Sequence, residues 1–413
     1  MYRLLWNISW GLQAVLLLYS CYYFLVALFG LRPQKNRPVF PPQKRIAVLV
    51  AARNEGEVIG QLVETLQRQN YPKELYQVIV APNNCTDDTR EVARRAGARI
   101  YDCALPVRSK GDVLRQMFRT LLREDWDAFC IFDADNLVHP DFLSRMNDAL
   151  CQGARAAQGY RDSKNPHDSW ISSCYSIYYW MVNRLYSRSR SALGLSAIVN
   201  GSGFLVSADL LREMGGWRTY TMTEDIEFST QCILRGVQVA WVPKAVTYDE
   251  QPLTFAQSWK QRKRWSTGLL QGFVRYFLPL ARTGLRQRRA ACFDQMLFFL
   301  APFMQMMYVV SGLLTLQLNL LAVHQGLITA EFCWSRALLS LNLSFVIGTA
   351  LAVLVVILEG KSSLRMLKGV AGYWLFITSW LPINLLCLFR RCTCWEEIRH
   401  TRKLKLSDLT LFR

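Results

Sequence analysis

The sequence predicts an α/β protein: a Rossmann-like domain with a mainly parallel sheet, flanked by transmembrane and interfacial α-helices. Three observations predict this class. Short β-rich runs alternate with helical runs through the polar middle, long uncharged runs lie at both ends, and a basic amphipathic segment follows the middle. Strands separated by helices of about 10–15 residues are typical of right-handed crossovers and parallel pairing.

Four runs without a charged residue are long enough to cross a bilayer, which takes about 20 apolar residues. They are 4–31, 295–330, 337–358 and 369–389, with His324 counted as neutral. Buried core helices are the alternative, but a soluble domain rarely contains four such runs. The first run is too long for a cleaved signal peptide and lacks a small-residue cleavage site, so we predict a retained anchor.

The polar middle, 44–253, is predicted to form the sheet domain. Alternating strands and helices are expected in its first half: strands at 45–52, 77–81, 100–103 and 128–133, and helices at 57–69, 87–96 and 111–122. More mixed structure is expected in its second half, with helices at 169–188 and from Glu224, and a strand at 237–248. Parallel sheets bind ligands at the carboxyl ends of their strands. Three polar sequences lie at such ends: Arg53-Asn54-Glu55, Pro82-Asn83-Asn84 and Asp133-Ala134-Asp135.

The segment 254–290 is predicted to form amphipathic interfacial helices. Large apolar residues recur in it at helical spacing with basic residues between them, as in helices that lie in a membrane interface. The remaining organisation follows: an anchor and basic linker at 1–43, a transmembrane region at 291–390 and a basic tail at 391–413.

The formal net charge is +18, and the basic residues gather beside the uncharged runs. Nine basic residues and no acid lie in 255–293, and the tail from Arg390 holds seven basic residues against three acidic ones. Such placement follows the positive-inside rule and suits anionic lipid. No nucleic-acid recognition motif is present, so the bilayer, and no nucleic acid, is the expected partner of these charges.

Two acidic motifs could carry chemistry. Asp133 and Asp135 end an apolar strand, where two carboxylates can share one hard cation while a diphosphate supplies further oxygens; a solvated turn is the alternative. Glu224 and Asp225 open a predicted helix and could act as a general base toward an acceptor hydroxyl; helix capping is the alternative.

Two basic motifs could meet a phosphate. Lys110 begins a predicted helix, where its ammonium and the first N–H groups can reach an anion; an ordinary exposed lysine is the alternative. In the amphipathic segment, Gln261, Arg264 and Trp265 form a Q-x-x-R-W pattern. Arg264 could bind phosphate and Trp265 could stack on a sugar ring; lipid contact is the alternative.

In this order, the motifs resemble those of inverting glycosyltransferase family 2, in its membrane-bound processive form of cellulose, hyaluronan, chitin and poly-N-acetylglucosamine synthases. The resemblance runs from about residue 45 to 275, with membrane segments on both sides. It rests on Ala52-Arg53-Asn54-Glu55, Lys110-Gly111, Asp133/Asp135, Gly201-Ser202-Gly203-Phe204, Thr223-Glu224-Asp225 and Gln261/Arg264/Trp265. It implies a GT-A fold, a nucleoside-diphosphate sugar donor, and Mg²⁺ or Mn²⁺ as cofactor.

The resemblance also implies a role for each matching residue. Asp225 is expected to be the catalytic base, with Glu224 beside it, and Asp135 and Asp133 are expected to hold the metal. The donor-binding set is Arg53, Asn54, Glu55, Asn83, Lys110, Asp133 and Arg264. The acceptor-binding set is Gly201, Ser202, Gly203, Gln261 and Trp265. The chain departs from the family at Asn83–Asn84, where relatives usually carry an acid that reads uracil; an asparagine amide can still pair with a base edge.

The expected reaction is inverting transfer of a sugar, from a UDP-sugar by family expectation, to a growing β-linked polysaccharide, coupled to translocation across the membrane. One alternative is a single addition to a lipid or other acceptor. Another is an inactive transferase-like scaffold, against which the intact Asp133, Asp135 and Asp225 argue. The sequence does not specify the oligomeric state.

The cytoplasmic location of nucleotide sugars places the middle domain inside and the N-terminus outside. Three crossings after the domain would put the basic tail outside, against the positive-inside rule. We therefore expect a cytoplasmic tail, with 369–389 re-entrant or interfacial around Pro382. Alternatively, 295–330 makes two short passes around Pro302.

Overall fold

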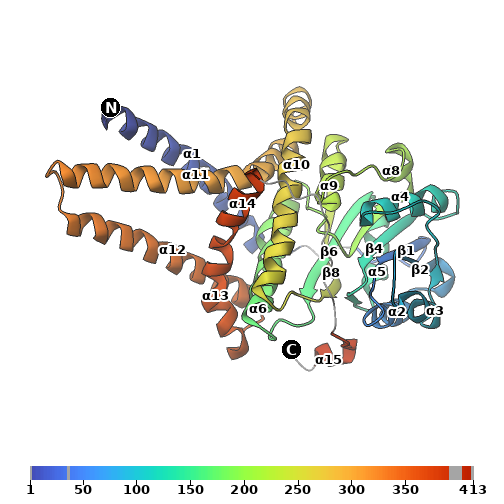
Figure 1. Cartoon of the computed structure of the whole chain (residues 1–413). Helices are drawn as coiled ribbons and strands as arrows, with labels where there is room; N and C mark the ends of the chain where they lie inside the picture. The colour runs from blue at the N-terminus through green and yellow to red at the C-terminus, as the bar shows by residue number, and fades with distance from the viewer. Residues whose placement is uncertain (1, 35–37, 390–401, 411–413) are drawn as a thin grey trace.

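The computed structural model describes residues 2–34, 38–389 and 402–410. Eight strands form one sheet in the order β3-β2-β1-β4-β7-β6-β8-β5 (Figure 1). The strands are β1 Ile46–Ala52, β2 Tyr76–Pro82, β3 Arg99–Ile100, β4 Ala128–Asp133, β5 Leu137–Val138, β6 Ala156–Ser163, β7 Phe204–Ser207 and β8 Val239–Asp249.

The sheet is mixed, and four of its seven strand pairings are parallel, in agreement with the prediction of a mainly parallel sheet; β3, β2, β1 and β4 form its parallel half. Strands β3, β2, β1 and β4 pair in parallel, and β6 pairs in parallel with β8. Strand β7 is antiparallel to both β4 and β6, and β5 is antiparallel to β8. Strand β7 is antiparallel to β4 because it begins where β4 ends. The start of β7 lies beside Asp133, the last residue of β4, and there the Gly203 N–H donates to the Ile131 carbonyl.

Helices cover both faces of the parallel half. In β1, Ile46, Val48 and Val50 belong to the core beneath α2 (Ile59–Gln67), α3 (Thr89–Arg95) and α5 (Phe142–Cys151). The alternate residues Ala47 and Leu49 belong to the core beneath α4 (Lys110–Leu121), α8 (Ala208–Glu213) and α9 (Glu224–Leu234). A strand buried on both faces must be apolar along its whole length. This explains why continuous apolar runs predict the strands of this half.

The predicted helices and strands of the first half are present, with ends within a few residues of those expected. The exception is the strand expected at 100–103, because β3 contains only Arg99 and Ile100. Strands β6 and β7 were not predicted. Strand β6 starts with alanine, glutamine and glycine, which are weak strand formers, and β7 has only four residues. The helix expected at 169–188 is α6 (Trp170–Met181), which continues through a π-helical segment, η3 (Val182–Arg188), into α7 (Ser189–Ala192).

Beyond the sheet domain the chain is helical. A 33-residue helix, α10 (Phe255–Gln287), replaces the amphipathic helices predicted at 254–290 and begins with a capping box between Thr254 and Gln257. The other long helices are α1 (Tyr2–Leu28), α11 (Ala290–His324), α12 (Ala330–Leu358), α13 (Leu367–Thr378) and α14 (Trp380–Phe389). A short helix, α15 (Leu406–Thr410), lies near the C-terminus.

Four helical stretches are long and apolar enough to cross a bilayer: Arg3–Leu31, Ala290–His324, Ala330–Leu358 and Leu364–Phe389. Figure 1 shows α1, α11 and α12 projecting from one side of the sheet domain, whereas α13 and α14 run across them along α6 and α10. The alternative of two short passes in 295–330 is wrong, because α11 continues through Pro302 as one helix. A proline costs one backbone hydrogen bond and need not end a helix that neighbouring helices support.

A buried ion pair joins α11 to the domain, and a hydrogen bond from α1 reaches the same carboxylate. Both nitrogens Nε and Nη2 of Arg190 lie 2.8 Å from the Asp294 carboxylate of α11, and the Tyr22 hydroxyl of α1 donates to the same carboxylate at 2.7 Å. Removing either charge would leave the other buried without a counter-charge, so this cluster fixes α1 and α11 against α7.

The basic linker and tail are described only in part, since Lys35 and Arg37 of the linker and residues 390–401 and 411–413 of the tail lie outside the described residues. The segment 402–410 lies against the sheet domain. The Arg402 N–H donates to Glu250 at 3.1 Å, and the Arg402 guanidinium pairs with Asp168 at 2.5 Å. This part of the tail is therefore on the same side of the projecting helices as the sheet domain.

Candidate active site

A cavity of about 640 Å³, the main cavity, lies at the carboxyl ends of β1, β2 and β4. Its remaining walls come from the starts of α4 and α9, from one face of α10, and from α6 and η3. Of the fifteen residues predicted from the sequence, all but Asn54, Ser202 and Gly203 line it: Arg53, Glu55, Asn83, Lys110, Asp133, Asp135, Gly201, Glu224, Asp225, Gln261, Arg264 and Trp265. The fold thus brings motifs as far apart in the sequence as Arg53 and Trp265 into one site.

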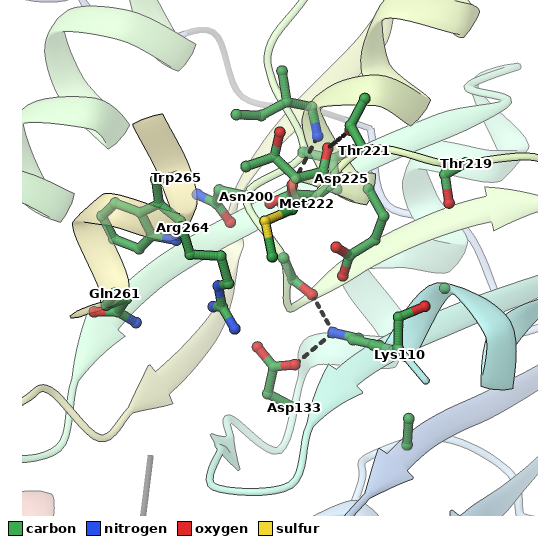
Figure 2. A pocket seen from close by; sticks show the side chains of 18 of the residues that line it. Lys110, Asp133, Asn200, Thr219, Thr221, Met222, Asp225, Gln261, Arg264 and Trp265 are labelled. Carbon is green, nitrogen blue, oxygen red and sulfur yellow. Dashed lines mark hydrogen bonds and ion pairs between the residues drawn. The ribbon is translucent and has the colours of Figure 1, made fainter. Parts of the chain in front are cut away.

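The strand-end aspartates differ in their contacts. Asp133, the last residue of β4, forms an ion pair in which Lys110 Nζ lies 2.5 Å from its Oδ1, and Lys110 also donates to the Gly201 carbonyl at 2.7 Å. Asp135 is buried, and its Oδ2 accepts from the Glu250 N–H at 2.9 Å. Figure 2 shows Lys110, Asp133 and Arg264 pointing toward a common space. Two cations and two carboxylates at a strand end form a site suited to an anion together with a metal.

The three predicted residues outside the cavity wall hold its loops in place. Asn54 has a φ of 55° and accepts from the Thr86 N–H at 2.8 Å, which ties the β1 loop to the β2 loop. The Ser202 hydroxyl accepts from the Asp133 N–H at 3.0 Å. Gly203 has a φ of 61°, and a Cβ there would lie 2.7 Å from Thr247, so both conformation and space exclude a side chain.

Asp225 lies in the first turn of α9, across the cavity from Lys110. Its Oδ1 accepts from the Ile226 N–H at 2.8 Å. Desolvation in the cavity wall, followed by the negative charge of Glu224, raises the pKa of the Asp225 carboxyl to about 7, against smaller lowering effects of Lys110 and Arg161. A carboxylate with a pKa near neutrality is suited to accept a proton.

Gly201 lies between Asp225 and Asp133. A Cβ built at this position would lie 3.4 Å from Asp225 Oδ2 and 3.9 Å from Asp133 Oδ2. The backbone of the Gly-Ser-Gly segment therefore borders the space between the two acids, and a side chain there would enter the reaction space.

The Q-x-x-R-W residues lie on the cavity face of α10, whereas Arg262 between them is buried on another face and donates to the Phe376 carbonyl at 2.8 Å. The Trp265 ring lies nearly parallel to the Tyr178 and Trp380 rings, with interplanar angles of 23° and 26° and centroid distances of 6.1 Å. All three residues line the cavity. We call Tyr178, Trp265 and Trp380 together the aromatic group.

Several polar atoms in the cavity wall have no hydrogen-bond partner among the described residues. They are both amide atoms of Asn200, Oε1 of Gln261, Nε of Arg264 and Oγ1 of Thr219. Buried polar groups are normally paired, so a polar ligand is expected to supply their partners.

Four of the lining residues, Arg161, Tyr178, Trp380 and Glu250, are not among those predicted from the sequence. Arg161, whose guanidinium lies 4.3 Å from the Tyr179 ring centre and pairs with Asp249, comes from β6, which had no sequence signal. Tyr178 and Trp380 come from helices without a motif. Glu250 could have been found, because it is an acid at the carboxyl end of the strand expected at 237–248.

The donor set for a metal is carboxylate oxygen, which suits Mg²⁺ or Mn²⁺. Within the described part of the chain, no group of three or more histidine, cysteine, aspartate or glutamate side chains is arranged to hold a metal ion. Asp133 and Asp135 therefore fit a metal only as part of its coordination shell, with the remaining oxygens coming from a bound diphosphate or water.

Known proteins were compared by sequence and by fold. The chain is 25% identical over 280 residues to Probable glycosyltransferase YdaM of Bacillus subtilis, covering 63% of each chain. It is 25% identical over 265 residues to the β-monoglucosyldiacylglycerol synthase of Nostoc sp., covering 62% of this chain and 55% of that one. The chain thus spans about 55–63% of the length of these relatives.

A solved structure of a mannosyltransferase, PcManGT from Pyrobaculum calidifontis, matches with a TM-score of 0.61 over 93% of this chain and 99% of that one, at 18% identity. The likeness shows a shared GT-A fold that includes the helical C-terminal region. The model of the family described as Glycosyltransferase like family 2 matches residues 41–268. Because that match covers more than half of its length, this chain belongs to glycosyltransferase-like family 2.

Proposed function

We propose that this protein is a metal-dependent inverting glycosyltransferase that uses a nucleoside-diphosphate sugar at the cytoplasmic face of a membrane. One observation carries the proposal. A single cavity holds Asp225, whose pKa lies near neutrality, across from an anion-binding end formed by Lys110, Arg264 and the strand-end aspartates. An acceptor hydroxyl and a diphosphate leaving group need these two ends.

The donor would lie along the strand ends. Arg53, Glu55 and Asn83 border the space for the nucleotide, and Lys110 and Arg264 would bind the diphosphate. Asp133 and Asp135 would hold Mg²⁺ or Mn²⁺, which when bound neutralises charge on the leaving diphosphate. The fold relative PcManGT is described in complex with GDP-Man and Mn²⁺, which supports a metal. UDP is the nucleotide expected from the family resemblance.

The proposed reaction is one displacement. Asp225 accepts the proton of the acceptor hydroxyl, whose oxygen bonds to the anomeric carbon as the bond from that carbon to the diphosphate oxygen breaks. Lys110 and Arg264 stabilise the negative charge that develops on the diphosphate. A single displacement inverts an α-linked donor to a β-linked product. The names of relatives that make β-monoglucosyldiacylglycerol and poly-β-1,6-N-acetylglucosamine agree with a β-linked product.

The acceptor would lie on the aromatic group Tyr178, Trp265 and Trp380, because aromatic faces suit the apolar faces of sugar rings. A growing β-linked polysaccharide fits this group, and its translocation beside the projecting helices is part of the proposal. Reconstitution into sealed vesicles tests it: product protected from an added glycosidase supports translocation, and product that is fully digested contradicts it.

A lipid acceptor is the second candidate. The main cavity is also lined by Leu269, by Tyr186 of η3 and by Phe298, which belongs to the projecting helix α11. An apolar end at a membrane helix would admit the chain of an amphiphile. Products of a single sugar addition on lipid support this candidate, whereas a ladder of polymer lengths supports the polysaccharide.

The same proposal includes the topology. The four candidate spans support an integral membrane protein. With α1, α11 and α12 crossing and α13–α14 lying in the interface, the domain and the tail are both cytoplasmic. Labelling of a single introduced tail cysteine from outside intact cells would contradict it.

The overall function is tested with purified protein and a panel of UDP- and GDP-sugars. We expect release of nucleoside diphosphate with one of them, dependent on added Mg²⁺ or Mn²⁺, and a product of inverted anomeric configuration by NMR. A product with retained anomeric configuration, or full activity in excess chelator, would contradict the proposed mechanism.

A further inference from the structure

A second cavity, the arginine cavity, lies behind the wall of the main cavity. It has a volume of about 620 Å³ and is lined by the end of α4 and the loop that follows α8. Among the described residues, no acid lines it and four arginines do: Arg115, Arg119, Arg212 and Arg218. Arg115 and Tyr220 line both cavities, so the 215–223 loop separates them and leads directly into Glu224 and Asp225.

The positive charge of the arginine cavity is only partly compensated. Arg115 pairs with Asp112 and Arg212 pairs with Asp209, at 3.2 Å and 3.0 Å. For Arg119 and Arg218, no ion pair is present within the described residues. Two guanidinium groups without a counter-charge in a concave site attract an anion that can accept several N–H bonds at once.

One of the residues that line the arginine cavity has an unpaired donor. Trp217 is 1% exposed and lines the cavity, and its indole N–H has no hydrogen-bond partner among the described residues. Its ring is fixed by stacking on Phe228, with centroids 4.8 Å apart and an interplanar angle of 21°. An indole N–H can only donate, so a ligand oxygen that reached it would supply its missing acceptor.

We propose that the arginine cavity binds a soluble, phosphate-bearing small molecule at a site separate from the donor-sugar site. Figure 1 shows α4 and α8 on the side of the domain away from α1, α11 and α12, which favours a soluble ligand over a lipid headgroup. This site goes beyond the proposed function and does not depend on it, since its residues are not those of the proposed reaction.

Trp217 lines the arginine cavity, whereas Trp265 and Trp380 line the main cavity, and this allows one experiment to separate the two cavities. The full chain is labelled with 5-fluorotryptophan in micelles, and Trp217→Phe and Trp265→Phe assign the two ¹⁹F resonances. Inorganic pyrophosphate is then titrated without divalent metal. We expect a saturable shift of the Trp217 resonance that persists in Lys110→Gln. In Arg119→Gln/Arg218→Gln, binding measured at Trp217 should be at least about tenfold weaker.

The matched control is Arg95→Gln/Arg123→Gln, which removes two exposed arginines outside both cavities and should leave the Trp217 titration unchanged. The proposal is wrong if the Trp217 resonance stays fixed while that of Trp265 saturates, or if the Trp217 shift survives in Arg119→Gln/Arg218→Gln. A shift seen only with vesicles of anionic lipid, and not with pyrophosphate, would instead assign the site to a lipid headgroup.

Discussion

The two ends of the main cavity are built differently. At the proposed donor end, Arg53 and Asn83 follow strands of the parallel half of the sheet and Asp133 ends one, and both faces of that half are buried. At the acceptor end, the aromatic group draws Tyr178, Trp265 and Trp380 from three helices far apart in the chain. A sheet fixes its strand ends relative to one another through backbone hydrogen bonds, whereas the helices depend on side-chain packing.

This difference indicates which end of the cavity would determine donor binding and which would determine the choice of acceptor. We expect the geometry of the sheet end to be preserved when its surroundings change, because backbone hydrogen bonds fix the strand ends. The helical end includes Phe298 and Trp380, which belong to α11 and α14, so the acceptor would be selected where the membrane region meets the domain. Substitutions at the two ends should therefore affect different measured quantities.

The largest effect is expected between the two ends, at the proposed base. Asp225→Asn keeps size and shape but removes basicity, so turnover should fall by about 10²–10⁴-fold while donor binding is kept. Turnover and calorimetric binding of the donor are measured on one purified variant. Near-normal turnover would mean that Asp225 only caps α9, a task that asparagine performs equally well.

The next effect tests the donor end. Asp135→Ala removes a buried carboxylate that accepts from the Glu250 N–H and is proposed to bind the metal. Loss of metal-ion stabilisation worth a few kcal/mol should lower turnover by about 10²-fold, without full recovery in excess Mn²⁺. Manganese binding is followed by electron paramagnetic resonance, and unchanged affinity for manganese in the presence of nucleoside diphosphate would remove Asp135 from the site.

The sequence was informative about the two ends to different degrees. Motif residues at strand ends were predictable because a buried parallel strand is a continuous apolar run, and its end is visible as the first polar residues. The amphipathic pattern of 254–290 suggested that Trp265 stacks on a sugar ring, and the family resemblance assigned Gln261 and Trp265 to the acceptor. Tyr178, Trp380 and Arg161 could not be found, because their place in the site depends on helix packing and on the unpredicted strand β6, neither of which has a local sequence pattern.

A smaller effect is expected at the acceptor end. Trp265→Ala removes one ring of the aromatic group and should raise the KM for acceptor about three- to tenfold, as expected for about 0.5–1.5 kcal/mol of ring contact. The KM for the donor should stay within error. Trp334→Ala, at an exposed position of α12, is the control. Equal changes in both KM values would show that the two ends are not separable.

The smallest effect is a shift in pH dependence that isolates the interaction between Glu224 and Asp225. Only the ionised Asp225 carboxylate can accept a proton, so turnover should fall as the pH drops through about 7. The charge of Glu224 is the second cause of the raised pKa, after desolvation. Glu224→Gln removes that charge and should move the acidic limb of the turnover profile to lower pH, while Glu64→Gln, at an exposed position of α2, should not move it.

The free energy of unfolding should also depend on pH through protonation of the Asp225 carboxyl, and the direction of this dependence can be predicted. The folded protein keeps the Asp225 proton up to about pH 7, whereas an unfolded chain releases it near 3.8. The folded state therefore binds more protons between these values, and this contribution to stability is lost as the pH rises through 7. Thermal unfolding of wild type and Glu224→Gln across pH 5 to 8 should show a smaller loss in the variant. A turnover profile that is unchanged in Glu224→Gln would mean that a group other than Asp225 controls the acidic limb.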